Sequence, residues 1–223
     1  MSDVAHTAVG HHHPALQHHF DTLEQQQAAA SFGMWVFLVT EVLFFGGLFM
    51  AYILYRTWYH DMFVAASSHL NIPLGAFNTA VLIGSSLTMA LAVRAAKVGE
   101  RGALMFYLVA TMILGAVFLG VKVIEYSDKF EHHLVPGPHF QFAAPYEHTA
   151  QLFFSLYFAM TGLHALHMII GFGIMAVILA MAWRGRFSPE WNTPVEITGL
   201  YWHFVDLVWI FLFPLLYLIG GAH

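Results

Sequence analysis

The sequence contains no cysteine and few charged residues. The absence of cysteine excludes a disulfide framework, a thiolate-ligated metal and a thiol nucleophile. Only 9% of the 223 residues are Asp, Glu, Lys or Arg, whereas soluble globular domains contain about 25%. Lys and Arg together number eight and the formal net charge is -5. This balance argues against a protein that binds nucleic acid or an anionic surface through a basic patch.

Apolar residues are abundant instead. Hydrophobic types make up 59% of the chain, aromatic types make up 16%, and the mean hydropathy is +0.66. Five apolar windows reach the length of about 20 residues that a helix needs to cross a bilayer. They cover residues 30–55, 74–96, 103–123, 150–183 and 197–220. The pattern predicts an all-α, multi-pass membrane protein in which residues 30–223 form one bundle of five transmembrane helices.

Residues 1–29 differ from the rest of the chain because they are polar. They contain no Lys or Arg, so they lack the positively charged start of a signal peptide and are expected to remain on the mature protein. Leu16, Phe20 and Leu23 recur at helical spacing, which predicts a short amphipathic helix lying on a surface. A partly ordered tail is the equally weighted alternative.

The positions of the cations predict the orientation of the bundle, because cytoplasmic loops hold an excess of Lys and Arg. With the N-terminus in the cytoplasm, five cations fall inside and three outside. The inner set is Arg94, Lys97, Arg101, Arg184 and Arg186, and the outer set is Arg56, Lys122 and Lys129. The proline-containing, acidic loop of residues 125–149 also suits the exterior. We therefore expect a cytoplasmic N-terminus and a periplasmic C-terminus.

One acidic residue, Glu41, lies near the middle of the first predicted span, beside Phe37, Phe44 and Phe45. A charge in hydrocarbon is costly, so the carboxyl group is expected to be protonated most of the time. These residues support two interpretations equally. Glu41 acts in a proton relay or its regulation, or it forms an interhelical hydrogen bond that fixes helix packing.

Two histidines of the fourth predicted span, His164 and His167, are three residues apart and therefore share a helix face. As metal or haem ligands they would need partners at equal depth on other helices, and only His203 is available. As structural groups they would form hydrogen bonds across the bundle, between small residues that let helices approach. We favour the structural interpretation, and the absence of HEXXH spacing argues against a zinc peptidase.

A second polar pair, His203 and Asp206, is embedded in the apolar run GLYWHFVDLVWIFLFPLL of the last predicted span. The two residues are three apart, so Asp206 can accept a hydrogen bond from His203 or from a neighbouring helix. A charged pair, a neutral pair and a site for a lipid head group all remain open.

Other polar residues are expected to have packing or surface roles. Asn78 and the hydroxyl residues of the second predicted span should hold helices together. The loop histidines His132, His133 and His139 lack the spacing and the second shell of a metal site, so we expect them to be solvated.

From about residue 32 to residue 220 the chain resembles subunit III of the haem-copper cytochrome c oxidases. The segment YWHFVD, followed by VW and an aromatic run, is similar to part of the family's last helix. Four further segments are similar in the same order: WVFLVTEVLFFGGLFMAY, which resembles the family's third helix, FNTAVLIGSSLTMALA, KVIEYSD and TGLHALHMIIG. Family members with seven helices have two more spans before the one that corresponds to residues 30–55, so this chain resembles the short, five-helix bacterial form.

The resemblance implies a non-redox subunit of a proton-pumping terminal oxidase of aerobic respiration, in the bacterial cytoplasmic membrane. It implies direct binding to subunit I, and subunit II and small subunits in the same complex, with cytochrome c as the substrate of that complex. The haems and the copper are expected in subunits I and II, so this chain has no catalytic residue, no metal ligand and no cofactor beyond bound phospholipid. Its implied role is to support proton uptake and to protect the active site during turnover.

The resemblance also implies roles for single residues. Glu41 takes the place of the family's carbodiimide-reactive acid. Lipid-binding candidates are His167, Arg184 and His203. Buried polar residues assigned to helix packing are Asn78, Glu125, His164, His167, His203 and Asp206.

Two other functions remain open. Subunit III of a quinol oxidase would have the same fold and a different reductant. A membrane cytochrome with bis-histidine haem, which we favour less, would use His164 or His167 together with His203.

Overall fold

The computed structural model describes residues 16–146 and 149–218, and its regular structure is helical. The helices are α1 (Leu23–Trp58), α2 (His60–Ser67), α3 (Ile72–Val98), α4 (Arg101–Glu131), α5 (Ala150–Trp183) and α6 (Thr193–Tyr217). All except α2 are long and apolar enough to cross a membrane. The prediction of an all-α, multi-pass protein with five spans is thereby confirmed.

The first helix begins earlier than predicted and leaves no separate surface helix. Residues 16–22 form turns and bends, and α1 starts at Leu23 after the N-cap Thr22, whose side chain accepts a hydrogen bond from the Gln25 backbone. The Gln25 side chain accepts in turn from the backbone N–H of Asp21. The short helix predicted from Leu16 onward is therefore wrong, because reciprocal capping fixes the helix start at residue 23. Residues 1–15 of the predicted tail lie outside the described part.

The length of α1 exceeds the thickness of a bilayer. Its 36 residues extend roughly 54 Å, against a hydrocarbon core of about 30 Å. The helix must therefore tilt or extend beyond the core. The short helix α2, which the sequence did not predict, follows it directly and buries Met62 and Phe63.

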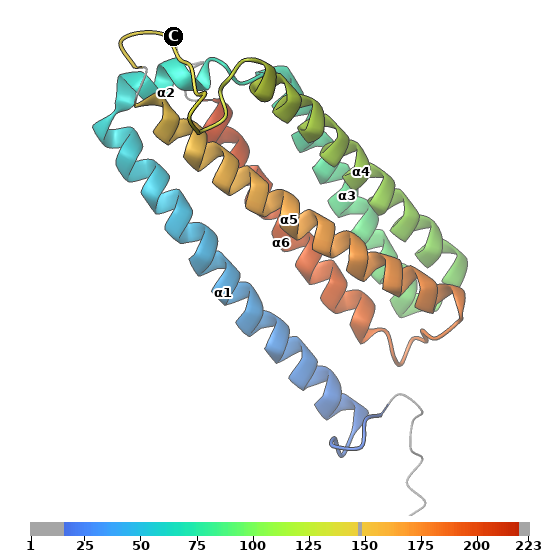
Figure 1. Ribbon diagram of the computed structural model, residues 1–223. Coiled ribbons are helices and arrows are strands. Elements are labelled where there is room, and N and C mark those ends of the chain that lie inside the picture. Colours follow the sequence, from blue (N-terminus) through green and yellow to red (C-terminus); the bar gives the residue numbers. More distant parts are fainter. Residues whose placement is uncertain (1–15, 147–148, 219–223) are drawn as a thin grey trace, which may run out of the picture.

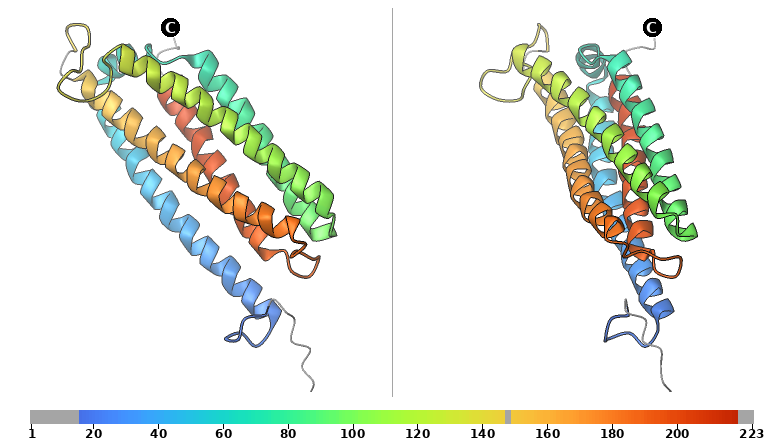
Figure 2. Two further views of the ribbon diagram at one scale, coloured as in Figure 1. Left: turned by 45° about the vertical axis from the view of Figure 1, so that its right-hand side comes forward. Right: turned by 90° about the vertical axis from the view of Figure 1, so that its right-hand side faces the viewer.

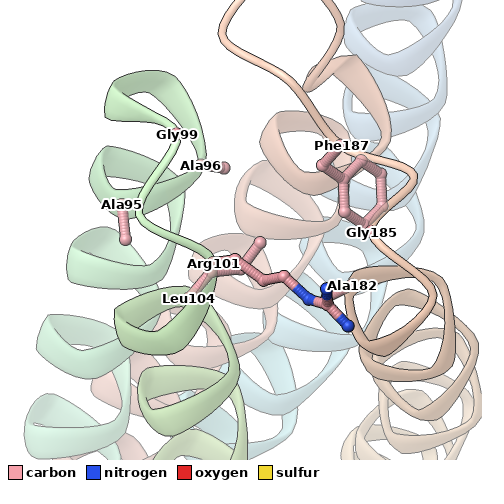
Figure 3. Close-up of a pocket in the computed structure, with 8 residues that line it drawn as sticks. All are labelled: Ala95, Ala96, Gly99, Arg101, Leu104, Ala182, Gly185 and Phe187. Atoms are coloured by element: carbon pink, nitrogen blue, oxygen red, sulfur yellow. The ribbon is translucent and has the colours of Figure 1, made fainter.

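The five long helices form a bundle in which α6 packs against most of the others (Figures 1 and 2). α6 packs against α3, α5 and α1, while α3 and α4 form an antiparallel hairpin. α1 lies at the edge of the bundle, where it packs against α6 and α5. The hairpin turns at Gly99, whose φ of +82° is in the left-handed region that glycine tolerates best. Beside this turn, Arg101 extends from the start of α4 and donates a hydrogen bond to the carbonyl of Trp183 at the end of α5 (Figure 3).

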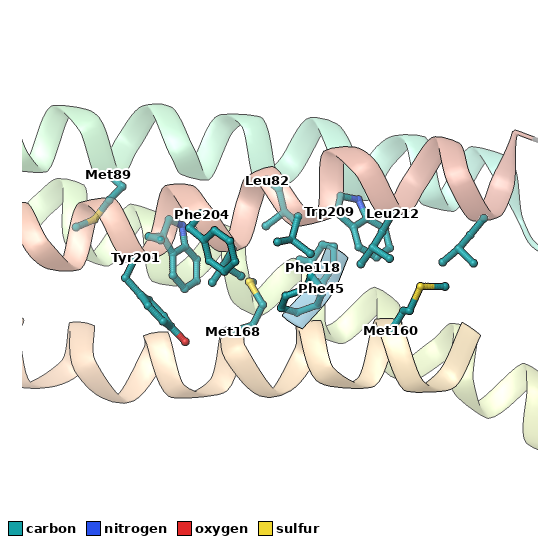
Figure 4. Close-up of a cluster of buried hydrophobic side chains, with 14 of the residues drawn as sticks. Phe45, Leu82, Met89, Phe118, Met160, Met168, Tyr201, Phe204, Trp209 and Leu212 are labelled. Carbon is teal, nitrogen blue, oxygen red and sulfur yellow. The ribbon is translucent and has the colours of Figure 1, made fainter. Parts of the chain in front are cut away.

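Aromatic side chains of α6 fill the centre of the bundle (Figure 4). Figure 4 shows Phe204, Trp209 and Leu212 of α6 between α3 and α5. The neighbouring Trp202 is fully buried and lies against Gly171, where an added Cβ would be 2.8 Å from the indole ring. Glycine at this position is therefore what lets α5 approach α6, as small residues do at helix interfaces in membranes.

Candidate functional site in the membrane interior

Glu41 of α1 contacts His167 of α5. The distance from Glu41 Oε2 to His167 Nε2 is 3.2 Å, and the two side chains are 19% and 13% exposed. The Phe45 ring packs edge-on against the imidazole, with 5.3 Å between ring centres. The structure thus gives Glu41 a titratable partner, which was not predicted because the two residues are 126 positions apart.

The second nitrogen of His167 determines how many protons this pair holds. His167 Nδ1 lies 2.8 Å from the carbonyl oxygen of Leu163, and a carbonyl oxygen only accepts. Nδ1 therefore carries a hydrogen, and the contact with Glu41 needs one more. That hydrogen is either on the carboxyl group or on Nε2. Both arrangements leave the pair with no net charge, which limits the cost of placing two ionisable groups in a membrane.

His164 has different surroundings from His167. It is 1% exposed, its ring packs against Phe118 and Trp209, and neither ring nitrogen has a hydrogen-bond partner in the described chain. Of the two histidines, only His167 forms a hydrogen bond to a side chain of another helix among the described residues. Both ring nitrogens of His167 are engaged in hydrogen bonds, so of the two histidines considered as haem ligands only His164 has ring nitrogens without a partner in the described residues.

His203 and Asp206 do not pair with each other. His203 Nδ1 lies 2.7 Å from the hydroxyl of Ser86 on α3. Asp206 is 3% exposed, and neither of its oxygens has a hydrogen-bond partner in the described chain. Neither pairing considered for Asp206, with His203 or with a neighbouring helix, is therefore a hydrogen bond among the described residues, and His203 contacts α3 instead.

Hydroxyl residues of α3 connect this helix to α6 and α4, as expected from the packing role predicted for them. Trp202 Nε1 donates to Ser85, and Trp209 Nε1 donates to Thr79. Thr88 bonds to a threonine of α4 at 2.8 Å. Asn78 is fully buried and has no hydrogen-bond partner in the described residues.

A buried ion pair within α4, between Lys122 and Glu125, was not predicted from the sequence. Lys122 Nζ lies 2.8 Å from Glu125 Oε2 on the same helix, and the residues are 4% and 3% exposed. Tyr157 of α5 and Tyr217 of α6 both donate hydrogen bonds to Glu125 Oε1. Trp209 adds a cation–π contact, with 4.8 Å from Nζ to the ring. The assignment of Lys122 to an exterior loop is therefore wrong, because α4 continues to Glu131 and places Lys122 inside the bundle.

The loop histidines lie on the surface at the α2 end of the bundle. His132, His133 and His139 are exposed, as expected of a solvated loop. Nearby, partial burial lowers the pKa of His69, and the charges of Lys129 and His132 lower it further. Among residues 16–146 and 149–218, no group of three or more His, Asp and Glu side chains could hold a metal ion.

The three lipid-binding candidates are not brought together. His167 faces Glu41, whereas Arg184 is exposed after the end of α5. His203 lines a groove of about 350 Å³ together with Lys97 and Glu196. Of the three lipid-binding candidates, only His203 therefore lines this groove.

The fold and the interior define a multi-pass α-helical membrane protein with ionisable residues inside its helical bundle. Residues 6–221 match the family model described as cytochrome c oxidase subunit III. The chain therefore belongs to the cytochrome c oxidase subunit III family, the subunit III chains of haem-copper respiratory oxidases.

Relatives include chains from oxidases with different reductants. A cytochrome c oxidase subunit 3 from Thermostichus vulcanus is 36% identical over 192 residues, 84% of this chain and 86% of the relative. A cytochrome bo(3) ubiquinol oxidase subunit 3 from Pseudomonas aeruginosa is 30% identical over 214 residues, 96% of this chain and 92% of the relative. A cytochrome c oxidase subunit 3 from Tetraodon nigroviridis is 31% identical and is matched over 75% of its length.

Proposed function

We propose that this chain is a non-redox subunit of a proton-pumping cytochrome c oxidase in a bacterial cytoplasmic membrane. It binds subunit I directly, and it shares one complex with subunit II, which with subunit I holds the haems and the copper. Within the complex it supports proton uptake and protects the active site during turnover. The observation that carries this proposal is the contact between Glu41 and His167 inside the membrane.

The Glu41–His167 pair has the properties of a regulated proton site. Because Nδ1 of His167 is engaged by the Leu163 carbonyl, the single mobile proton lies between the Glu41 oxygen and Nε2. A protein-bound carboxyl and an imidazole exchange a proton readily when they are hydrogen-bonded and shielded from water. The pair also joins α1 to α5. Gain or loss of the proton shared by Glu41 and His167 is therefore coupled to the position of α1 at the edge of the bundle.

The reductant is cytochrome c in this proposal, and the alternative is quinol. The ubiquinol oxidase relative keeps that alternative open. Because the reductant binds to other subunits, we expect the identity of the co-purifying chains to show whether the complex oxidises cytochrome c or quinol. A tagged form of this chain should purify with subunits I and II, and mass spectrometry should find a copper-binding cysteine pair in subunit II. A subunit II without that pair would assign the chain to a quinol oxidase, and purification without a subunit I would contradict the proposal.

Lipid binding is the second part of the proposal. The groove lined by Lys97 and His203 has the size and the mixed polarity that a phospholipid head group requires. Arg184 is not among its lining residues, so we assign the head-group contact to Lys97 and His203.

The orientation with a cytoplasmic N-terminus is also proposed. Lys122 and Lys129 are 4% and 2% exposed, so burial removes both from the exterior cations and leaves Arg56 against the five inner cations. This imbalance supports the orientation more strongly than the sequence alone did.

Cysteine labelling tests the orientation in a chain that has no cysteine of its own. Ala143→Cys, in the exposed loop between α4 and α5, should react with a membrane-impermeant maleimide in intact cells. Glu100→Cys, in the exposed turn between α3 and α4, is the matched control and should react only after the membrane is broken. The reverse pattern would show that the N-terminus is outside.

A further inference from the structure

The contact between Glu41 and His167 depends on how α1 is held against the rest of the bundle. α1 is the least buried of the five spans, because 17% of its most apolar window is buried, against 28% or more in the other four. It packs against α6 and α5 along its length and against α2 at its end. A small number of specific contacts must therefore set the distance between Glu41 and His167.

Two phenylalanines of α1 flank Glu41, and both contact aromatic rings of α6. Phe37 stacks on Tyr201, with 6.1 Å between the ring centres and 29° between the ring planes. Phe45 packs edge-on against Phe204, with 6.2 Å between the ring centres. Each phenylalanine is four residues from Glu41, about one helical turn. The two contacts therefore fix the depth and the rotation of α1 at the position of Glu41.

Tyr201 also contacts the other member of the pair. Its hydroxyl donates a hydrogen bond of 2.9 Å to the carbonyl oxygen of His167, and Figure 4 shows this end of the side chain directed at α5. Gly171, one turn after His167, makes room for the tyrosine, because an added Cβ would be 3.2 Å from Tyr201 Cε1. Tyr201 is 4% exposed, and a buried phenolic hydroxyl needs such a partner.

The position of His167 is thereby fixed at two points besides Glu41. Its Nδ1 is bonded to the carbonyl of Leu163, and its own carbonyl accepts from Tyr201. Nε2 then lies 3.2 Å from the Glu41 oxygen. A hydrogen bond of this length is lost when the two atoms separate by about 1 Å more. Small displacements of α1 or α5 therefore decide whether the pair shares a proton.

We propose that Tyr201 is a positioning residue for the Glu41–His167 pair. It joins α6 to both helices that carry the pair, to α1 through the ring of Phe37 and to α5 through the carbonyl of His167. It keeps Nε2 within hydrogen-bond distance of the Glu41 carboxyl group, and it acts through the pair rather than by transferring a proton. This inference rests on the proposed proton role of the pair.

A hydrophobic carbodiimide measures how often the pair opens in the complete oxidase complex. The reagent has to reach a Glu41 oxygen, so labelling is faster when Glu41 is not bonded to His167. Tyr201→Phe keeps the ring and removes the hydroxyl, and it should accelerate labelling of Glu41 by roughly two- to tenfold, the equivalent of one lost hydrogen bond. Tyr52→Phe is the matched control and should leave the rate unchanged. It removes a fully buried hydroxyl of α1 that has no hydrogen-bond partner in the described residues.

The effect of Tyr201→Phe should depend on His167. In a His167→Gln background it should produce no further acceleration, because the pair is already broken. The pH profile of labelling in Tyr201→Phe should also move toward that of His167→Gln, which looser packing alone would not cause. Phe37→Leu tests the α1 side of the link and should accelerate labelling in the same direction. Phe37 is 38% exposed, so this variant applies the same criteria if Tyr201→Phe does not assemble into the complex.

Two results would overturn the proposal. If Tyr201→Phe is labelled as slowly as Tyr52→Phe and with the native pH profile, the Tyr201 hydroxyl has no influence on the pair. If the acceleration is equally large in the His167→Gln background, Tyr201 holds α1 without acting through His167. A different result, His167→Gln labelled like the native chain, would overturn the proton role of the pair itself and this inference with it.

Failure of the proposed function is therefore distinguishable from failure of the positioning role.

Discussion

Replacing Lys122 with methionine is expected to destabilise the bundle by about 3–5 kcal/mol, because it leaves the Glu125 carboxylate buried without a counter-ion. Glu125 is 3% exposed, and its other partners are two tyrosine hydroxyls, which cannot neutralise its charge. We expect the loss to appear as a lower midpoint temperature for unfolding of this chain in the detergent-solubilised complex, followed by far-ultraviolet circular dichroism and by release of the chain.

Two variants control for this effect. The double substitution Lys122→Met with Glu125→Leu removes both charges, and it should recover most of the lost stability because apolar residues replace a buried ion pair at little cost. Lys97→Met breaks the exposed pair with Glu196 and should cost less than about 1 kcal/mol. A single Lys122→Met variant as stable as Lys97→Met would show that Glu125 does not need the lysine.

Substitutions of Glu41 should separate its chemistry from its packing role. Glu41→Ala leaves His167 Nε2 without its partner and should cost about 1–3 kcal/mol. Glu41→Gln keeps a hydrogen-bond donor for Nε2 and should preserve assembly, but it cannot release a proton. We therefore expect Glu41→Gln to retain electron transfer and to reduce proton pumping or the number of turnovers before inactivation.

A hydrophobic carbodiimide provides a direct probe of the same residue. It reacts with protonated carboxyl groups in apolar surroundings, so labelling should concentrate on Glu41 and be absent in Glu41→Gln. The matched control is His167→Gln, which removes the imidazole partner while retaining the Glu41 carboxyl group. If Glu41→Gln leaves pumping, electron transfer and enzyme lifetime unchanged, Glu41 is a packing residue and its proposed role must be abandoned.

The spans could be predicted from the sequence because hydropathy reflects the bilayer directly. Apolar windows placed the five long helices correctly, while the ends were placed less well. α1 begins at Leu23, well before the predicted start at residue 30, and α4 continues well beyond the predicted end at residue 123, to Glu131. Polar residues at those ends are compatible with a helix once they extend beyond the hydrocarbon or find partners within the bundle. Local composition alone does not reveal those partners.

The buried polar contacts were less predictable because each depends on residues distant in sequence. Glu41 was recognised as unusual from its position in an apolar run, but its contact with His167 depends on how α1 packs on α5. Lys122 was misplaced because a lysine at the end of a hydrophobic window is usually solvated. Here Glu125, Tyr157 and Tyr217 surround it. The i, i+3 spacing of His203 and Asp206 suggested a pair, yet His203 bonds to Ser86 of α3 instead.

Deletion of this chain from the oxidase is the most direct test of its role as a non-redox subunit that supports proton uptake. The measurement is turnover of the remaining complex, with its haem absorption spectrum recorded alongside. We expect an unchanged haem spectrum and initial electron transfer close to that of the whole enzyme, but slower proton uptake and inactivation after fewer turnovers. Loss of a haem band with the chain, or an enzyme that takes up protons and survives turnover as well without it, would contradict the proposed function.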